Sequence, residues 1–163
     1  MQFVINDLSL LYHKINMKID KLNINKKEIK YIDGRYIGQV VNGLAEGKGT
    51  WYGTKEPYIG DRYEGEFRND KKDGKGIEYY NKEPFKGDRY EGDFGNGKKE
   101  GKGIMYYNDG DRYEGDWRNG NREGKGIYYF HNGDRAMGDF YNGKPIGKHV
   151  TLTRNGEVKI NNF

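Results

Sequence analysis

Aromatic and charged residues alternate in a six-residue segment that occurs three times along the chain. In residues 62–67, Arg-Tyr-Glu-Gly-Glu-Phe, Tyr63 and Phe67 fall on one side of an extended strand, and the charged residues fall on the other. Residues 89–94 and 112–117 repeat the pattern. The alternation predicts strands with one aromatic and one charged face. The glycine between the two rings either lets a neighbouring ring lie over bare backbone or marks a bend.

The spacing of the aspartates that precede these segments shows a repeat. Asp61 and Asp88 are 27 residues apart, whereas Asp88, Asp111 and Asp134 follow one another at intervals of 23. After each strong copy, a turn rich in Asn and Gly leads to a second strand that begins with Lys-Gly-Ile. Self-similarity at this period is typical of units that bury a face only by stacking on their neighbours. The chain is therefore predicted to be an all-β repeat array.

The residues Tyr-Glu-Gly-x-Trp/Phe, followed by a turn and Gly-x-Gly at a period of about 23 residues, resemble the MORN repeat. The resemblance covers residues 34–156 and implies β-hairpins laid side by side in one elongated, single-layer, twisted antiparallel sheet. Eroded first and last units are expected, because such units cap the stack. The five expected repeats are residues 34–60, 61–87, 88–110, 111–133 and 134–156.

Residues 1–33 precede the repeats and differ from them in pattern. Apolar residues recur there at the i, i+3, i+4, i+7 spacing of one helical face, which predicts an amphipathic N-terminal helix over residues 7–23 and then a linker. Such a helix can cap the open first hairpin, mediate dimerisation or lie on a membrane surface. Residues 157–163 are predicted to close the sheet as a cap strand. The apolar stripe consists of Leu8, Leu11, Tyr12, Ile15, Ile19 and Leu22, flanked by Lys14, Lys18 and Lys21.

Composition supports an extended fold and offers little chemistry. The chain has 26 Gly, 33% hydrophobic residues and a mean hydropathy of −1.14, but its 15 Tyr and 7 Phe supply aromatic area that disordered chains lack. It has no Cys, and its three His are not spaced to share a metal or form a relay. Its acidic residues recur from unit to unit, whereas a catalytic site is usually singular. We therefore expect no enzyme activity, no cofactor and no metal site.

A row of aromatic rings is the strongest candidate for a binding surface. A single-layer sheet has no second layer to cover such a row, and exposed aromatic strips usually mark interaction sites. We expect an apolar segment of a protein partner, or a second copy of the chain, to contact it. Two insertions, residues 55–60 and 82–87, should protrude side by side and add Tyr58 and Phe85 as candidates, unless these rings fold back on the sheet edge. The row itself consists of Tyr63, Phe67, Tyr90, Phe94, Tyr113 and Trp117.

Binding of acidic phospholipids is the alternative function. Basic and acidic residues are nearly balanced across residues 61–140, and the formal net charge of +4 comes from the two ends of the chain. This balance argues against nucleic acid as a partner. We expect a cytoplasmic scaffold, associated with the cytoskeleton or with a membrane. The lipid would be contacted by basic residues of the hairpin turns, namely Lys71, Lys72, Lys98, Lys99 and Arg122, although acidic residues on the same turns weaken the attraction.

The charge balance generates a testable prediction about membranes. At physiological salt the protein should cosediment only weakly with anionic liposomes, and any binding should come from the basic ends of the chain. Deletion of residues 1–30 should then abolish the binding. Strong cosedimentation of the truncated chain would contradict this expectation and favour the lipid function.

Overall fold

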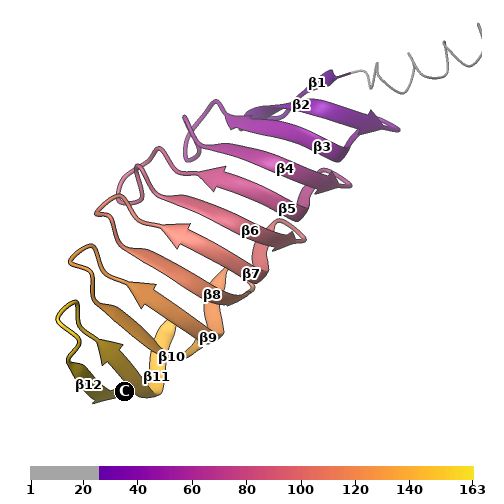
Figure 1. Ribbon diagram of the computed structural model, residues 1–163. Helices are drawn as coiled ribbons and strands as arrows, with labels where there is room; N and C mark the ends of the chain where they lie inside the picture. The colour runs from indigo at the N-terminus through magenta and orange to yellow at the C-terminus, as the bar shows by residue number, and fades with distance from the viewer. Residues whose placement is uncertain (1–25) are drawn as a thin grey trace, which may run out of the picture.

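The computed structural model describes residues 26–163, which form one antiparallel sheet of twelve strands. Each strand pairs with the strands before and after it in the chain, so the sheet grows in one direction as an open, elongated layer (Figure 1). This confirms the all-β, single-layer antiparallel array, whereas the helix predicted over residues 7–23 lies outside the described residues. The strands are β1 (Lys27–Lys30), β2 (Gly34–Val41), β3 (Leu44–Gly53), β4 (Arg62–Arg68), β5 (Lys71–Tyr79), β6 (Arg89–Gly95), β7 (Lys98–Tyr106), β8 (Arg112–Arg118), β9 (Asn121–Tyr129), β10 (Arg135–Tyr141), β11 (Lys144–Leu152) and β12 (Val158–Asn162).

Five hairpins, from β2–β3 to β10–β11, account for the repeats, and one further strand extends the sheet at each end. At the C-terminal end, β12 pairs with β11. At the N-terminal end, β1 pairs with β2, so Lys27, predicted as the last residue of the linker, already belongs to a strand. Ile29 lies opposite Tyr36 and packs against the core, which anchors this strand. Four residues are too few for a hydrophobic period to reveal such a strand.

Each hairpin closes through a two-residue turn in which both residues have positive φ. Asn96 and Gly97 have φ values of 50° and 85°, and the other four turns share this geometry. It is the type I′ pattern, which favours Asn and Gly. The turn is shorter than the Asn- and Gly-rich sequence indicates, since residues 98–101 already belong to β7. A β-bulge next to Gly92 accommodates two extra residues of β7, Gly101 and Lys102.

Aromatic rings form a continuous ladder along one face of the sheet, and this ladder is the core. Tyr90 packs edge to face on Phe94 and on Trp117, with ring centroids 5.1 Å apart in both pairs. Tyr63 and Tyr113 pack in the same way on the rings at either side of them. Edge-to-face pairs add to the hydrophobic gain of burying the rings. The ladder consists of Tyr36, Phe67, Tyr63, Phe94, Tyr90, Trp117, Tyr113, Phe140, His149 and Phe163, in spatial order.

A row of nine glycines lets the ladder lie directly on the backbone. These glycines pair across neighbouring strands from β2 to β10, and each ladder tyrosine covers the pair in its own hairpin. A Cβ atom on Gly103 would overlap the Tyr90 ring, whose hydroxyl donates a hydrogen bond to the Asp93 carbonyl oxygen at 3.0 Å. The approach of a ring to bare backbone is therefore confirmed as the role of these glycines. The glycine row consists of Gly38, Gly49, Gly65, Gly76, Gly92, Gly103, Gly115, Gly126 and Gly138.

The last hairpin continues the ladder with a different residue. Ala136 stands where the other hairpins have the ladder tyrosine, and His149 stands where they have the second glycine. The His149 ring comes from the opposite strand, lies over Gly138 and packs on Phe140 with centroids 5.2 Å apart. Its Nε2 lies 2.9 Å from the carbonyl oxygen of Asp139, in the place that a tyrosine hydroxyl takes in the other hairpins. The two substitutions therefore compensate each other.

Carboxylates join successive hairpins at both edges of the sheet. At the edge with the connections between hairpins, Asp88 accepts the backbone N–H of Asn108 at 2.9 Å. At the edge with the two-residue turns, Glu100 accepts the backbone N–H of Asn119 at 3.1 Å. Hydrogen bonds to charged groups contribute more than neutral ones, so repeated acidic residues stabilise the stack. The carboxylates in these positions are Asp61, Asp88, Asp111 and Asp134 at the first edge, and Glu46, Asp73, Glu100 and Glu123 at the second.

The contact between tyrosine and glycine predicts a sharp difference between two alanine substitutions in one hairpin. Gly103→Ala should lower the free energy of unfolding by about 1–3 kcal/mol, because its Cβ overlaps the Tyr90 ring and forces the ladder to shift. Gly95→Ala is the control, since its Cβ would make only ordinary contacts of 3.6 Å with Glu100, and it should change stability by less than about 0.5 kcal/mol. Urea unfolding followed by circular dichroism measures both. Equal effects would contradict the stacking of the ring on the backbone.

Candidate functional site

The aromatic ladder is buried, so the expectation that it forms an exposed strip is wrong. Glycine backbone lies beneath each tyrosine ring, and neighbouring rings pack on both sides of it, so a single layer suffices to bury it. Partner binding by these rings stays a prediction, but it has lost the exposed area on which it was based. The exposed fractions are 0% for Tyr63, Tyr90 and Tyr113, 5% for Phe94, and 6% for Phe67 and Trp117.

Three of the five basic residues proposed to bind lipid cover the ladder. The Nζ of Lys99 lies within 5.2 Å of the centroids of three aromatic rings, and Lys72 and Arg122 cover the neighbouring rings. Such cation–π contacts contribute about 0.5–2 kcal/mol each. Burial lowers the pKa of the Lys99 ammonium. Lys71 and Lys98 are exposed, and lipid binding by the turns stays a prediction.

The carboxylate of Glu78 lies on the ladder face beside these basic residues. Glu78 accepts hydrogen bonds from the Lys72 ammonium and from the Tyr80 hydroxyl. Burial by itself would raise the pKa of this carboxyl, but the Lys72 charge and the two hydrogen bonds outweigh burial, so the pKa is lowered. Glu78 and Lys72 therefore neutralise each other on the ladder face.

The two inserted loops lie side by side, as predicted, and their rings fold back on the sheet. An ion pair between Lys82 and Glu56 joins the loops. Tyr58 packs on the Trp51 ring at a centroid distance of 5.8 Å, and Phe85 packs at 6.4 Å on the ring of Tyr80, which directly follows β5 and precedes the loop. Tyr58 and Phe85 still expose 45% and 56% of their surface. Their role in partner binding stays a prediction.

An open groove of about 1410 Å³ runs along the face opposite the ladder, from β2 to β11. The backbone of the glycine row forms its floor, because any side chain there would point to the ladder face. One wall alternates aliphatic and acidic residues, as in Ile77, Glu91 and Ile104. The opposite wall consists mainly of lysines and acidic residues. Because the isoleucines are only half-buried, the groove offers apolar area along its length.

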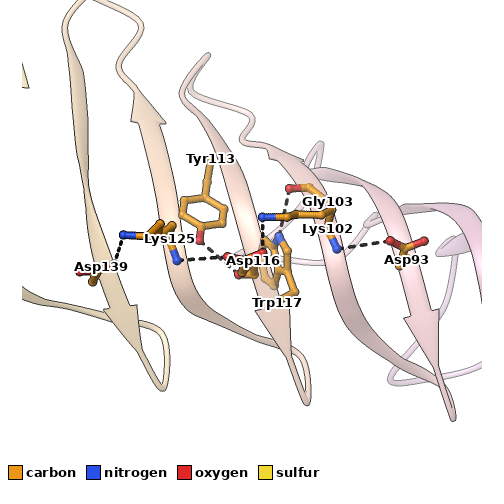
Figure 2. A network of polar contacts seen from close by, with 8 residues as sticks. All are labelled: Asp93, Lys102, Gly103, Tyr113, Asp116, Trp117, Lys125 and Asp139. Atoms are coloured by element: carbon orange, nitrogen blue, oxygen red, sulfur yellow. Dashed lines mark hydrogen bonds and ion pairs between the residues drawn. The ribbon is translucent and has the colours of Figure 1, made fainter.

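The lysines and aspartates of the second wall form a zipper between hairpins (Figure 2). The Nζ of Lys102 pairs with Asp116 of the next hairpin at 2.5 Å, and its backbone N–H donates to Asp93 at 3.3 Å. Lys125 repeats both contacts, with Asp139 and with Asp116. These pairs are exposed, so each contributes less than about 1 kcal/mol. They leave the groove nearly neutral, which does not favour a polyanionic ligand.

Within residues 26–163, no group of three or more His, Cys, Asp or Glu side chains is arranged to hold a metal ion. In the same part of the chain, no helix is long and apolar enough to cross a membrane. The groove instead combines apolar side chains with charges that already pair with each other.

Comparison with known proteins identifies the repeats. Residues 36–55, 63–82, 90–112 and 113–135, more than half of the chain, match the family model of the MORN repeat. The chain belongs to the MORN-repeat family. No curated protein sequence matches this MORN-repeat protein.

Among solved structures, the MORN-repeat protein resembles the TCP domain of SAS-4 (dCPAP) of Drosophila melanogaster, in complex with a proline-rich motif of Ana2 (dSTIL). The sequence identity is 13%, over 85% of this chain and 90% of that chain, with a TM-score of 0.46. So low a similarity says nothing about what this chain binds.

The groove was not among the sites predicted from the sequence, although its signal is present there. Ile77, Ile104 and Ile127 share one phase, opposite to that of the ladder tyrosines. Isolated isoleucines between charged residues are typical of an ordinary solvated face. The binding surface was therefore predicted at the aromatic rows. Pairing of the strands is what joins these isoleucines into one continuous wall.

The buried ladder makes stability depend on alkaline pH. Burial raises the pKa of Tyr36 and of Tyr113 to about 12, and it also raises the pKa of Tyr63 and Tyr90. An unfolded tyrosine ionises near about 10. The folded state therefore keeps protons that the unfolded state loses, so the contribution of these tyrosines to the free energy of unfolding should be constant below about pH 10 and fall as the pH rises toward 12.

Urea unfolding at pH 8, 10 and 11, with phenolate absorbance as a second readout, measures this dependence. Tyr113→Phe should weaken the alkaline loss of stability, because it removes one of the raised groups. Tyr141→Phe is the control, since Tyr141 is 63% exposed and should leave the pH profile unchanged. Identical profiles for wild type and Tyr113→Phe would contradict the assignment.

Proposed function

We propose that this MORN-repeat protein is a non-enzymatic scaffold that holds a segment of a partner protein in the groove opposite the ladder. The observation that carries the proposal is the groove itself, about 1410 Å³ of continuous open space with apolar side chains from β2 to β11. The other face is covered by the buried ladder and its basic side chains. The groove is therefore the long surface on which a partner finds apolar area.

The walls of the groove indicate the chemistry of the partner segment. Isoleucines in one wall favour an apolar stripe on the segment, because burying them removes apolar area from water. Charged rows on both sides are internally paired, as in Lys102 with Asp116 and Arg89 with Glu91. Such rows favour a segment that carries polar side chains on both flanks rather than a high net charge. An amphipathic segment that lies along the sheet meets both conditions.

The repeat gives such a segment a regular series of contacts. Ile77, Ile104 and Ile127 recur once per hairpin, two strands apart. Neighbouring strands are about 4.8 Å apart, so the isoleucines present apolar contacts at intervals of roughly 10 Å. A partner that engages several of these contacts at once is positioned along the whole array, which is what a scaffold requires.

A lysine in the groove wall tests the proposal. Ile104→Lys should preserve the fold, because residue 104 lies opposite Glu91 and Glu114 on the neighbouring strands and the ammonium can pair with them. It should weaken binding of a partner recovered with the wild-type protein by tenfold or more, about 1.4 kcal/mol. Ile59→Lys makes the same change on an inserted loop, where Ile59 is 50% exposed, and should leave the affinity unchanged.

Affinities are measured with the purified partner by calorimetry, and circular dichroism verifies the fold of each variant. If Ile59→Lys weakens binding and Ile104→Lys does not, the partner binds the inserted loops and the groove is not the site.

A further inference from the structure

We propose that residues 7–23 of this chain dock in the N-terminal part of the groove, where a partner segment has to displace them. The inference rests on the proposed function, because it supplies an internal occupant for the same groove. The segment lies outside the described residues, so the argument uses its sequence, the place where the described chain begins and the walls of the groove.

The segment has the chemistry that the groove favours. Six apolar residues follow the spacing of one helical face between Leu8 and Leu22, and Lys14, Lys18 and Lys21 flank this stripe. A helix with one apolar stripe buries it against an apolar surface wherever one is within reach. Within the same chain, the groove is such a surface.

The chain enters the sheet at the groove. Lys26, the first described residue, itself lines the N-terminal end of the groove. Only residues 24–25 separate it from the end of the predicted helix. A helix over residues 7–23 would be about 25 Å long, which corresponds to roughly five intervals between strands. It is therefore long enough to lie over the sheet from β1 to about β6 (Figure 1).

This end of the groove lacks the acidic residues that line its later part. Ile37 stands where the following hairpins have Glu64, Glu91 and Glu114, and Gln39 stands where the next hairpin has an acidic residue. The lining of β2 and β3 consequently contains aliphatic, glycine, threonine and lysine residues and no carboxylate. An apolar stripe docked in this part of the groove contacts Ile37 and buries no carboxylate.

Farther along the groove, carboxylates lie where the basic residues of the docked segment would be. Glu64 in β4 and Glu91 in β6 line the groove, and each pairs with an arginine of its own strand but leaves 43% and 49% of its side chain exposed to a second cation. Measured from Lys26 along the sheet, these strands are about 14 and 24 Å away. Lys18 and Lys14 would lie at comparable distances along a helix that starts close to Lys26. The order of charges on the segment therefore matches the order of carboxylates along the wall.

Disulfide trapping in the full-length chain tests the docking. The protein contains no cysteine, so each engineered pair reports a single contact. Ile15→Cys, on the apolar stripe, is combined with a cysteine in the groove at Thr50 or at Ile77, because the linker leaves the register open by about two strands. Met17→Cys lies on the opposite side of the same helix, one turn or less away, and is the matched control.

Docking should make Ile15→Cys form the intramolecular disulfide at least fivefold faster than Met17→Cys with one of the two groove cysteines. Equal rates in both groove positions overturn the inference, because a segment that is not docked samples both sides alike. Disulfide-linked dimers that increase with protein concentration overturn it too, in favour of exchange between two copies.

A second measurement covers the case in which cysteine variants unfold. A fluorescent peptide of residues 5–25 is added to the full chain carrying Leu11→Asp, Ile15→Asp and Ile19→Asp, whose own segment can no longer dock. The peptide should bind, and Ile77→Lys should weaken that binding at least tenfold. The inference is overturned if the peptide does not bind, or if Ile77→Lys leaves its affinity unchanged. If Ile104→Lys still abolishes partner binding, the proposed function survives and the internal occupant alone is lost.

Discussion

In every complete hairpin a tyrosine ring lies against the backbone of two paired glycines, and the rest of the structure depends on this contact. A single-layer sheet has no second layer to cover its apolar side chains, so a ring becomes fully buried only by approaching the backbone of its own sheet. Tyr36, Tyr63, Tyr90 and Tyr113 achieve 0% exposure in this way. Glycine in a strand costs about 0.5–1 kcal/mol. Burial of the aromatic ring, about 1.5–3 kcal/mol for a large apolar side chain, offsets that cost.

The glycine row also determines how the two faces of the sheet differ. On one face the rings cover the row, and each ring packs on rings from the neighbouring hairpins, which couples the repeats into one core. On the other face the same glycines form the floor of an open groove between two rows of longer side chains. The buried core and the open groove therefore lie on opposite faces of the sheet.

Charged residues, one third of the chain, hold hairpins together rather than form a charged surface. Aspartates such as Asp88 accept backbone N–H groups of the next hairpin, and lysines such as Lys102 pair across hairpins in the groove wall. Lys99 lies over the aromatic rings of the ladder. Because these groups are engaged with one another, the groove is nearly neutral.

The sequence by itself determined the class of fold and the composition of each hairpin. Alternation in residues 62–67 predicts the strand, the spacing of Asp61, Asp88 and Asp111 predicts the repeat, and both are observed. These features are local, since the side-chain period of a strand is set by backbone geometry. The same alternation places the glycine of each strand on the face of the two aromatic rings, and the structure has it there.

Only the tertiary structure decided which side chains are buried and which remain open. Alternation assigns Tyr113 to a face, but its burial depends on Gly126 and Phe140 from neighbouring strands. The replacement of a ladder tyrosine by His149 is visible only when β10 and β11 are paired. For the same reason the groove could not be predicted, because isoleucines 27 or 23 residues apart become one wall only when the strands stack in register. Exposure is a property of the assembled sheet, and a one-dimensional pattern does not contain it.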